Sequence, residues 1–217
     1  MVTTRPEHEA AQDEYESFLT QSGLSRGDLQ HIALEEVDFL ASFTAADVSG
    51  VLIGASPYNA DTPAAEKTRS QQHVEEQIRE LLTVILKEGI PLLATGVAFQ
   101  ILAAYLGTGT YEEFGEELGA VDLFLTAEGR EDPILAGLPQ AITVFAGHYE
   151  GVGEKVYACQ FNPELDAARF EQRVSIYDEA GYGDPDMSED ILTQARSSDA
   201  HDAGQIIRNF ASHFARG

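Results

Sequence analysis

Residues 91–102 read PLLATGVAFQIL and join two kinds of local structure. The first half is a short apolar run typical of a buried strand, and the second half continues as an apolar helix to about residue 106. A strand that turns sharply into a helix is how several α/β enzymes present a nucleophile at the carboxyl edge of a sheet. The residue at the turn is Gly96, which has no side chain. The stretch therefore predicts the backbone of a catalytic elbow without its nucleophile.

The composition is that of an acidic globular protein. The chain has 217 residues, 43% of them hydrophobic, and a formal net charge of -24. This length suits a single domain over residues 1–217 with a sizeable core. No run approaches the roughly 18 apolar residues of a membrane helix, and the N-terminus lacks the plan of a signal peptide, so we expect a cytoplasmic protein. Because the negative field repels nucleic acid and anionic membranes, neither is expected as a partner.

The excess of 37 acidic over 13 basic residues has two interpretations. One is an ordinary solvated acidic surface. The other is adaptation to high salt, in which dissolved ions screen the repulsion between the acidic groups. Thermal stability measured from low to molar KCl separates them, because a flat response excludes salt adaptation.

Potential metal ligands are few. The single cysteine, Cys159, excludes an internal disulfide and any cysteine-based structural zinc site. The six histidines show no close spacing of the kind that metal ligands have. We therefore expect neither a bound metal nor another cofactor.

Apolar periodicity predicts alternating strands and helices. Expected strands cover 2–4, part of 29–39, 51–54, 91–95, 120–126, 141–148 and 155–161; expected helices cover 7–21, 64–88, 96–106, 164–180 and 204–215, with a loop at 181–188. A right-handed crossover from 51–54 to 91–95 brings the loops at 54–58 and 95–97 near each other. The order predicts a three-layer α/β fold, with a mostly parallel central sheet flanked by helices.

Three motifs follow one another along the chain: the loop GASP at 54–57, the elbow at 91–100, and QFNPE at 160–164. Supporting segments are FGEELG at 114–119, DPIL at 132–135 and GHYE at 147–150. Together they resemble the class I glutamine amidotransferases, particularly stand-alone proteins similar to the glutaminase half of GMP synthase. The resemblance covers about residues 4–182 and implies their flavodoxin-like fold.

The resemblance also implies a Cys-His-Glu glutaminase site. In that chemistry a cysteine attacks the side-chain amide of glutamine, a histidine shuttles the proton, and a glutamate orients the histidine. By position, the nucleophile falls on Gly96, the base on Asn162 and the orienting acid on Glu164. Glycine has no thiolate, and asparagine does not exchange a proton near neutral pH. The resemblance therefore predicts a pseudoenzyme, in which Glu164 caps the helix that follows it.

The rest of the implied site consists of backbone amides and pocket residues. The resemblance assigns the stabilisation of an oxyanion to the loop of Gly54 and Ala55 and to Val97, which follows the nucleophile position. Gln100 and His148 would line a glutamine-sized pocket, although a structural role in hydrogen bonding is the alternative for His148. The implied partners are glutamine or a similar small amide, and a synthetase or another protein subunit.

Three other residues are candidates to replace the missing cysteine. We expect the Thr95 side chain to point away from the elbow, and Ser56 to serve loop geometry. Cys159 precedes Asn162 by an odd number of residues, so it should face the opposite side of the strand and lie in the core. Two alternatives to a pseudoenzyme stay open: an active amidohydrolase or amidotransferase with an unrecognised nucleophile, and an otherwise active enzyme carrying inactivating substitutions at Gly96 and Asn162.

Two features depart from the family plan. The first strand, at 2–4, is short. The span from 148 to 156 is also shorter than in the family, which places extra strands there. Either the sheet is smaller in this chain or its edge is organised differently.

Overall fold

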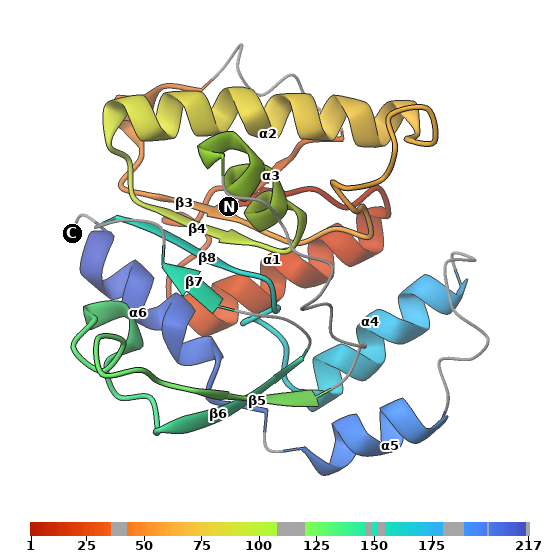
Figure 1. Ribbon diagram of the computed structural model, residues 1–217, viewed down its shortest axis with the longest axis vertical. Helices are drawn as coiled ribbons and strands as arrows, with labels where there is room; N and C mark the ends of the chain where they lie inside the picture. The colour runs from red at the N-terminus through yellow and green to blue at the C-terminus, as the bar shows by residue number, and fades with distance from the viewer. Residues whose placement is uncertain are drawn as a thin grey trace.

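The computed structural model describes residues 1–35, 43–107, 120–145, 149–151, 155–179, 189–198 and 200–215. Within these ranges, six strands form a central sheet in the order β2-β1-β3-β4-β8-β7 (Figure 1). The strands are β1 (Val2–Thr3), β2 (Ile32–Ala33), β3 (Val51–Ile53), β4 (Leu92–Thr95), β7 (Tyr149–Gly151) and β8 (Val156–Cys159). All neighbouring pairs are parallel except β7 with β8, which confirms the mostly parallel sheet.

Helices cover both faces of this sheet, as Figure 1 shows. On one face lie α2 (Arg69–Glu88) and α3 (Val97–Leu106), and on the other lie α1 (His8–Ser22) and α6 (Gly204–Phe214). Successive residues of a strand point to opposite faces, so Ile53 packs with α2 and α3 whereas Leu52 packs with α1 and α6. The three-layer arrangement is therefore confirmed.

The remaining helices form a smaller group at one side of the molecule. Helix α4 (Ala167–Glu179) packs with α5 (Glu189–Ser197) around a third apolar cluster that contains Phe145, Phe170 and Ala195. Helix α5 was not among the expected elements, because its sequence is polar and its apolar contacts lie with distant residues rather than in a local stripe.

A separate antiparallel pair follows the elbow helix in the chain. Strands β5 (Ala120–Phe124) and β6 (Ala141–Phe145) pair with each other and, as described, with no strand of the central sheet. Two short 3-10 helices, η2 (Ala45–Asp47) and η4 (Pro133–Leu135), lie in connecting segments. The expected strands at 120–126 and 141–148 are thus present at 120–124 and 141–145.

Several expected boundaries differ from the observed ones. Helix α2 begins at Arg69 rather than near residue 64, because the Thr68 side chain accepts the Gln71 N–H and so caps the helix there. Strand β1 is short but internal to the sheet, since it pairs with both β2 and β3. Beyond β8 the sheet edge is formed by β7, so this edge has an antiparallel strand.

Some expected features lie outside the described residues: the motif at 114–119, His148 and the loop at 181–188. In the part of the chain that is described, no helix is long and apolar enough to cross a membrane.

Candidate functional site

The predicted elbow is present between β4 and α3. Gly96 has φ 55° and ψ -122°, a conformation that glycine adopts readily and other residues rarely do. Its N–H donates to the Cys159 carbonyl at 3.1 Å, and its carbonyl accepts the Gln100 N–H at 3.3 Å. The strand-to-helix turn is therefore held from both sides by backbone hydrogen bonds.

Ala55 occupies the space in front of this elbow. A Cβ placed on Gly96 would lie 2.6 Å from the Ala55 Cβ and 3.1 Å from its Cα. The loops at 54–58 and 95–97 thus meet, as the crossover between β3 and β4 predicts. They meet so closely that a side chain at residue 96 requires the loop of Ala55 to move.

The carboxylate of Glu14, on α1, lies against the same loop. Its Oε1 accepts the Ala55 N–H at 3.1 Å, and a Cβ added to Gly54 would overlap its Oε2. The Thr4 hydroxyl also holds this loop, because it donates a hydrogen bond to the Ala55 carbonyl at 3.0 Å. A backbone N–H that the family resemblance assigns to an oxyanion is therefore already bonded to an anion of the chain itself.

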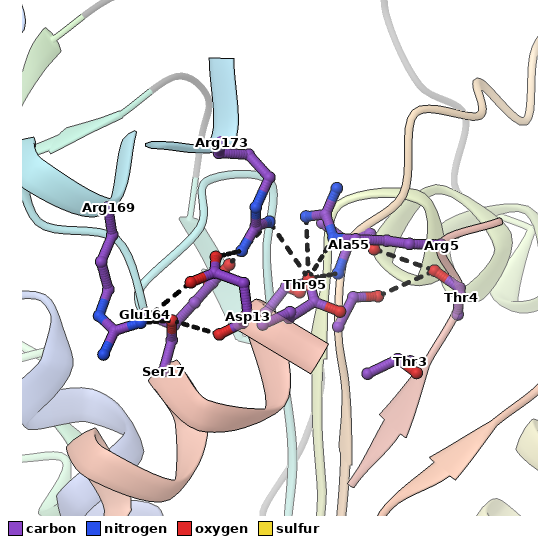
Figure 2. A network of polar contacts seen from close by, with 12 residues as sticks. Thr3, Thr4, Arg5, Asp13, Ser17, Ala55, Thr95, Glu164, Arg169 and Arg173 are labelled. Carbon is purple, nitrogen blue, oxygen red and sulfur yellow. Dashed lines mark hydrogen bonds and ion pairs between the residues drawn. The ribbon is translucent and has the colours of Figure 1, made fainter. Parts of the chain in front are cut away.

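Glu14 belongs to a group of five buried charged residues, here called the buried charge cluster: Arg5, Asp13, Glu14, Glu164 and Arg173. Figure 2 labels the members of this cluster other than Glu14. Each is at most 8% exposed. The Arg5 Nε and Nη2 atoms lie 2.9 and 2.8 Å from Glu14 Oε1. The Arg173 Nη2 atom lies 2.8 Å from Asp13 Oδ2, and its Nη1 is 3.9 Å from both Glu14 Oε1 and Glu164 Oε1. The cluster therefore links the β1 loop, α1, α4 and the segment after β8.

The rim of the cluster adds polar contacts between α1 and α4. Arg169 Nη1 lies 3.2 Å from Asp13 Oδ1 and donates to Ser17 Oγ at 2.7 Å. Arg5 Nη1 donates to the Tyr177 hydroxyl. Because Asp13 contacts both Arg169 and Arg173, one carboxylate on α1 anchors two successive turns of α4.

Glu164 takes a different position from the one expected. It is fully buried in the charge cluster, and the N-terminal turn of α4 is capped by Asp166, whose Oδ1 accepts the Arg169 N–H at 2.8 Å. Burial, and then the nearby Glu14 carboxylate, raise the pKa of Glu164 to about 7, although Arg173 and Arg5 oppose the increase. The expectation of a helix cap was wrong because Glu164 packs against charged partners from distant segments.

The candidates for an alternative nucleophile are two hydroxyl groups that form hydrogen bonds with the backbone and one buried thiol. Thr95 donates its hydroxyl to the Ile53 carbonyl at 3.0 Å, and Ser56 Oγ accepts the Tyr58 N–H at 3.1 Å. Cys159 is fully buried in the core, where burial and then Glu164 raise the pKa of its thiol well above the ordinary value. A thiol is nucleophilic as the thiolate, so Cys159 is unsuited to that role.

The other predicted site residues are distributed as follows. Gln100 Oε1 accepts the Ala60 N–H at 2.9 Å and so fastens the loop after β3. Val97 is buried at the first position of α3, where its N–H has no acceptor within the helix. The partly buried Asn162 follows β8, and its Oδ1 has no hydrogen-bond partner among the described residues. Among the predicted site residues, only His148 lies outside the part of the chain that the structure describes.

Sequence reasoning did not identify Arg5, Asp13, Glu14 or Arg173. A signal existed for Glu14, because it lies four residues after Ala10 and four before Phe18, both fully buried on the same face of α1. A charged residue on the apolar face of a helix indicates a buried partner. Among the residues that the structure describes, no group of three or more histidine, cysteine or acidic side chains is arranged to hold a metal ion.

Solved structures share this fold at low sequence identity. A glutamine amidotransferase from Thermotoga maritima has a TM-score of 0.68 and 17% identity, covering 100% of this chain and 98% of its own. A glutamine amidotransferase from Methylobacillus flagellatus has a TM-score of 0.58 and 14% identity, covering 99% and 92%. A protein from Thermoplasma acidophilum that is named as a GMP synthase subunit has a TM-score of 0.53 and 15% identity, covering 83% and 96%.

No family model and no curated protein sequence matches the chain. The TM-scores establish the shared fold, whereas the identities of 14–17% leave the activity to be inferred from the site. The chain has the class I glutamine amidotransferase fold that its three ordered motifs predicted.

Proposed function

We propose that this chain is a glutamine amidotransferase-like pseudoenzyme, which has lost glutaminase chemistry and acts through binding. The observation that carries the proposal is the contact between Ala55 and Gly96, which leaves no room for a nucleophile at the elbow. The bond from the Ala55 N–H to Glu14 supports it, because an occupied donor cannot stabilise a developing oxyanion. In this proposal Gly96, Asn162 and Glu164 stand at the positions of the triad without performing its chemistry.

We further propose a protein partner rather than glutamine as the ligand of the former active-site face. The buried charge cluster fills the region beside the loop of Ala55 with side chains of the chain itself. The name of the structural neighbour from Thermoplasma acidophilum calls that protein a subunit, which supports a protein partner for this chain. A synthetase-type subunit is the corresponding partner class for this chain.

Two tests on the purified protein decide between this proposal and an active amidohydrolase. The first measures ammonia release from glutamine, with a known glutaminase as the positive control, and we expect no release above buffer. The second incubates the protein with an electrophilic glutamine analogue and measures its intact mass, and we expect no adduct. Ammonia turnover together with an adduct on an identified residue would replace the proposal with the enzyme alternative.

A further inference from the structure

Helix α4 is joined to the central body in an unusual way. Its buried residues Phe170 and Val174 pack in the third apolar cluster with Phe145 and α5, and they do not belong to the cores on either face of the central sheet. Its polar contacts with α1 are made by Arg169 and Arg173, which reach Asp13, Ser17 and Glu14. The joint between α1 and α4 therefore depends strongly on charge.

The fully buried charges at this joint are unbalanced. Within the described part of the cluster, three buried carboxylates meet two buried guanidiniums, and the third guanidinium, Arg169, has a side chain that is 25% exposed. Arg173 Nη1 is equally far, 3.9 Å, from Glu14 and Glu164, which is too far for a hydrogen bond to either. A surplus carboxylate in such surroundings favours its neutral form.

Unpartnered atoms point to the same conclusion. In the described structure, both oxygens of Glu164, the Oε2 of Glu14 and the Nε and Nη1 of Arg173 have no hydrogen-bond partner. Buried polar atoms without partners cost free energy, and a proton on Glu164 adds one donor among these acceptors while removing one negative charge. Arg173 is then left to pair with Glu14 and Asp13.

We propose that Glu14, Glu164 and Arg173 form a proton-controlled latch that holds helix α4 against helix α1. With a proton on Glu164, the buried charges balance and the joint is closed. When the proton leaves, Glu14 and Glu164 carry adjacent negative charges that Arg173 and Arg5 offset only in part, and the joint weakens. The latch thus couples pH to the position of α4 and of the apolar cluster that it carries.

The charged and titratable groups that act on Glu164 come from four segments: Glu14 on α1, Arg5 after β1, Arg173 on α4 and the neutral Cys159 on β8. Asp13 and Tyr177 lie one step further out, against Arg173 and Arg5. The net result is a pKa of about 7, above the ordinary value of 4.5, with burial as the largest cause. A raised carboxyl pKa stabilises the folded state below the ordinary value, and this contribution is lost as the pH rises through about 7. The latch is therefore closed in weak acid and opens above neutrality.

Urea denaturation of the full chain at a series of pH values, from about pH 5 to about pH 8.5, tests the latch. The variants are Glu164→Gln, which mimics the protonated form, and Glu76→Gln, which removes an exposed acid on α2 as a control. As the pH rises, the unfolding equilibrium constant of the wild type should increase roughly 100-fold more than that of Glu164→Gln. Glu76→Gln should follow the wild type. Parallel pH profiles for the wild type and Glu164→Gln would overturn the proposal.

Hydrogen exchange locates the effect within the molecule. In the wild type, protection of α4 amides should decrease relative to α2 amides above neutral pH, and in Glu164→Gln the ratio should stay constant. Should Glu164→Gln not fold, infrared spectroscopy of the wild type gives the answer. The absorption of a protonated buried carboxyl should disappear with a midpoint near 7, and its absence at pH 6 would refute the latch.

Discussion

Ala55 and Gly96 are in contact across the two loops at the carboxyl edge of the sheet, and a Cβ on Gly96 would lie 2.6 Å from that of Ala55. Real Cβ atoms do not approach other atoms so closely within a well-packed interior. The missing side chain at the elbow is therefore matched by a neighbouring side chain that uses the space. The absence of a side chain at Gly96 and the close approach of the Ala55 loop form one packed arrangement.

This contact predicts that Gly96→Ala is more destabilising than the same substitution at a glycine of similar φ with open space around it. Gly89 is the matched control, because its φ of 64° is also positive but nothing lies within 4 Å of an added Cβ. Gly89→Ala should lower the free energy of unfolding by about 1 kcal/mol, the usual cost of a left-handed residue. Gly96→Ala should lower it by about 2–4 kcal/mol, since overpacking is added to backbone strain. Urea denaturation measures the free energy of unfolding of both variants. Equal losses would show that the loop of Ala55 moves aside at little cost.

A double-mutant cycle isolates the contact itself. Ala55→Gly removes the methyl group that collides, so it should recover about 1–2 kcal/mol in the Gly96→Ala background. The same substitution in the wild type should cost stability, because it deletes a buried methyl group and adds chain freedom. Additive effects would mean that the two loops do not collide.

Introducing cysteine at residue 96 and histidine at residue 162, as the family resemblance implies, should not produce glutaminase activity. In Gly96→Cys with Asn162→His, the new side chain at residue 96 meets Ala55, and the Ala55 N–H is still bonded to Glu14. We expect no glutamine-dependent ammonia release from the double variant, provided that circular dichroism shows it folded. Activity in this variant would instead support recent inactivation of a working enzyme. The triple variant with Ala55→Gly then tests whether steric closure alone blocks catalysis.

Glu14 is expected to be essential for stability. Glu14→Gln keeps an acceptor for the Ala55 N–H but leaves the buried Arg5 without its main counter-charge, at a cost of about 3–5 kcal/mol. Glu16 is the matched control on the same helix, because it pairs with the exposed Arg26. Glu16→Gln should leave the urea midpoint almost unchanged, since exposed ion pairs contribute little. Similar midpoints for the two variants would contradict the importance of the charge cluster.

Cys159 should be unreactive in the native protein. Its side chain is fully buried and the pKa of its thiol is raised, so little thiolate is present at neutral pH. An aromatic disulfide reagent should modify it only as the protein unfolds, with a rate that follows the unfolded fraction in urea. Rapid stoichiometric labelling without urea would reopen the possibility of a thiol-dependent activity.

The sequence alone determined the features that rest on local patterns. The apolar runs at 51–54 and 91–95 and the helical period at 64–88 predicted β3, β4 and α2, because side-chain periodicity reflects which face is buried. Gly96 was identified as the elbow because a strand, a glycine and a helix follow directly in the chain. The fold class followed from the order of these elements.

Only the tertiary structure decided what fills the site. Arg173 and Asp13 are 160 positions apart in the chain, and in so acidic a sequence Asp13 and Glu14 read as surface residues. The identity of their neighbours depends on where the loop after β1, α1 and α4 come together, which no local pattern specifies. Ala55 likewise reads as an ordinary loop residue until β3 and β4 pair, and their register brings its methyl group against Gly96.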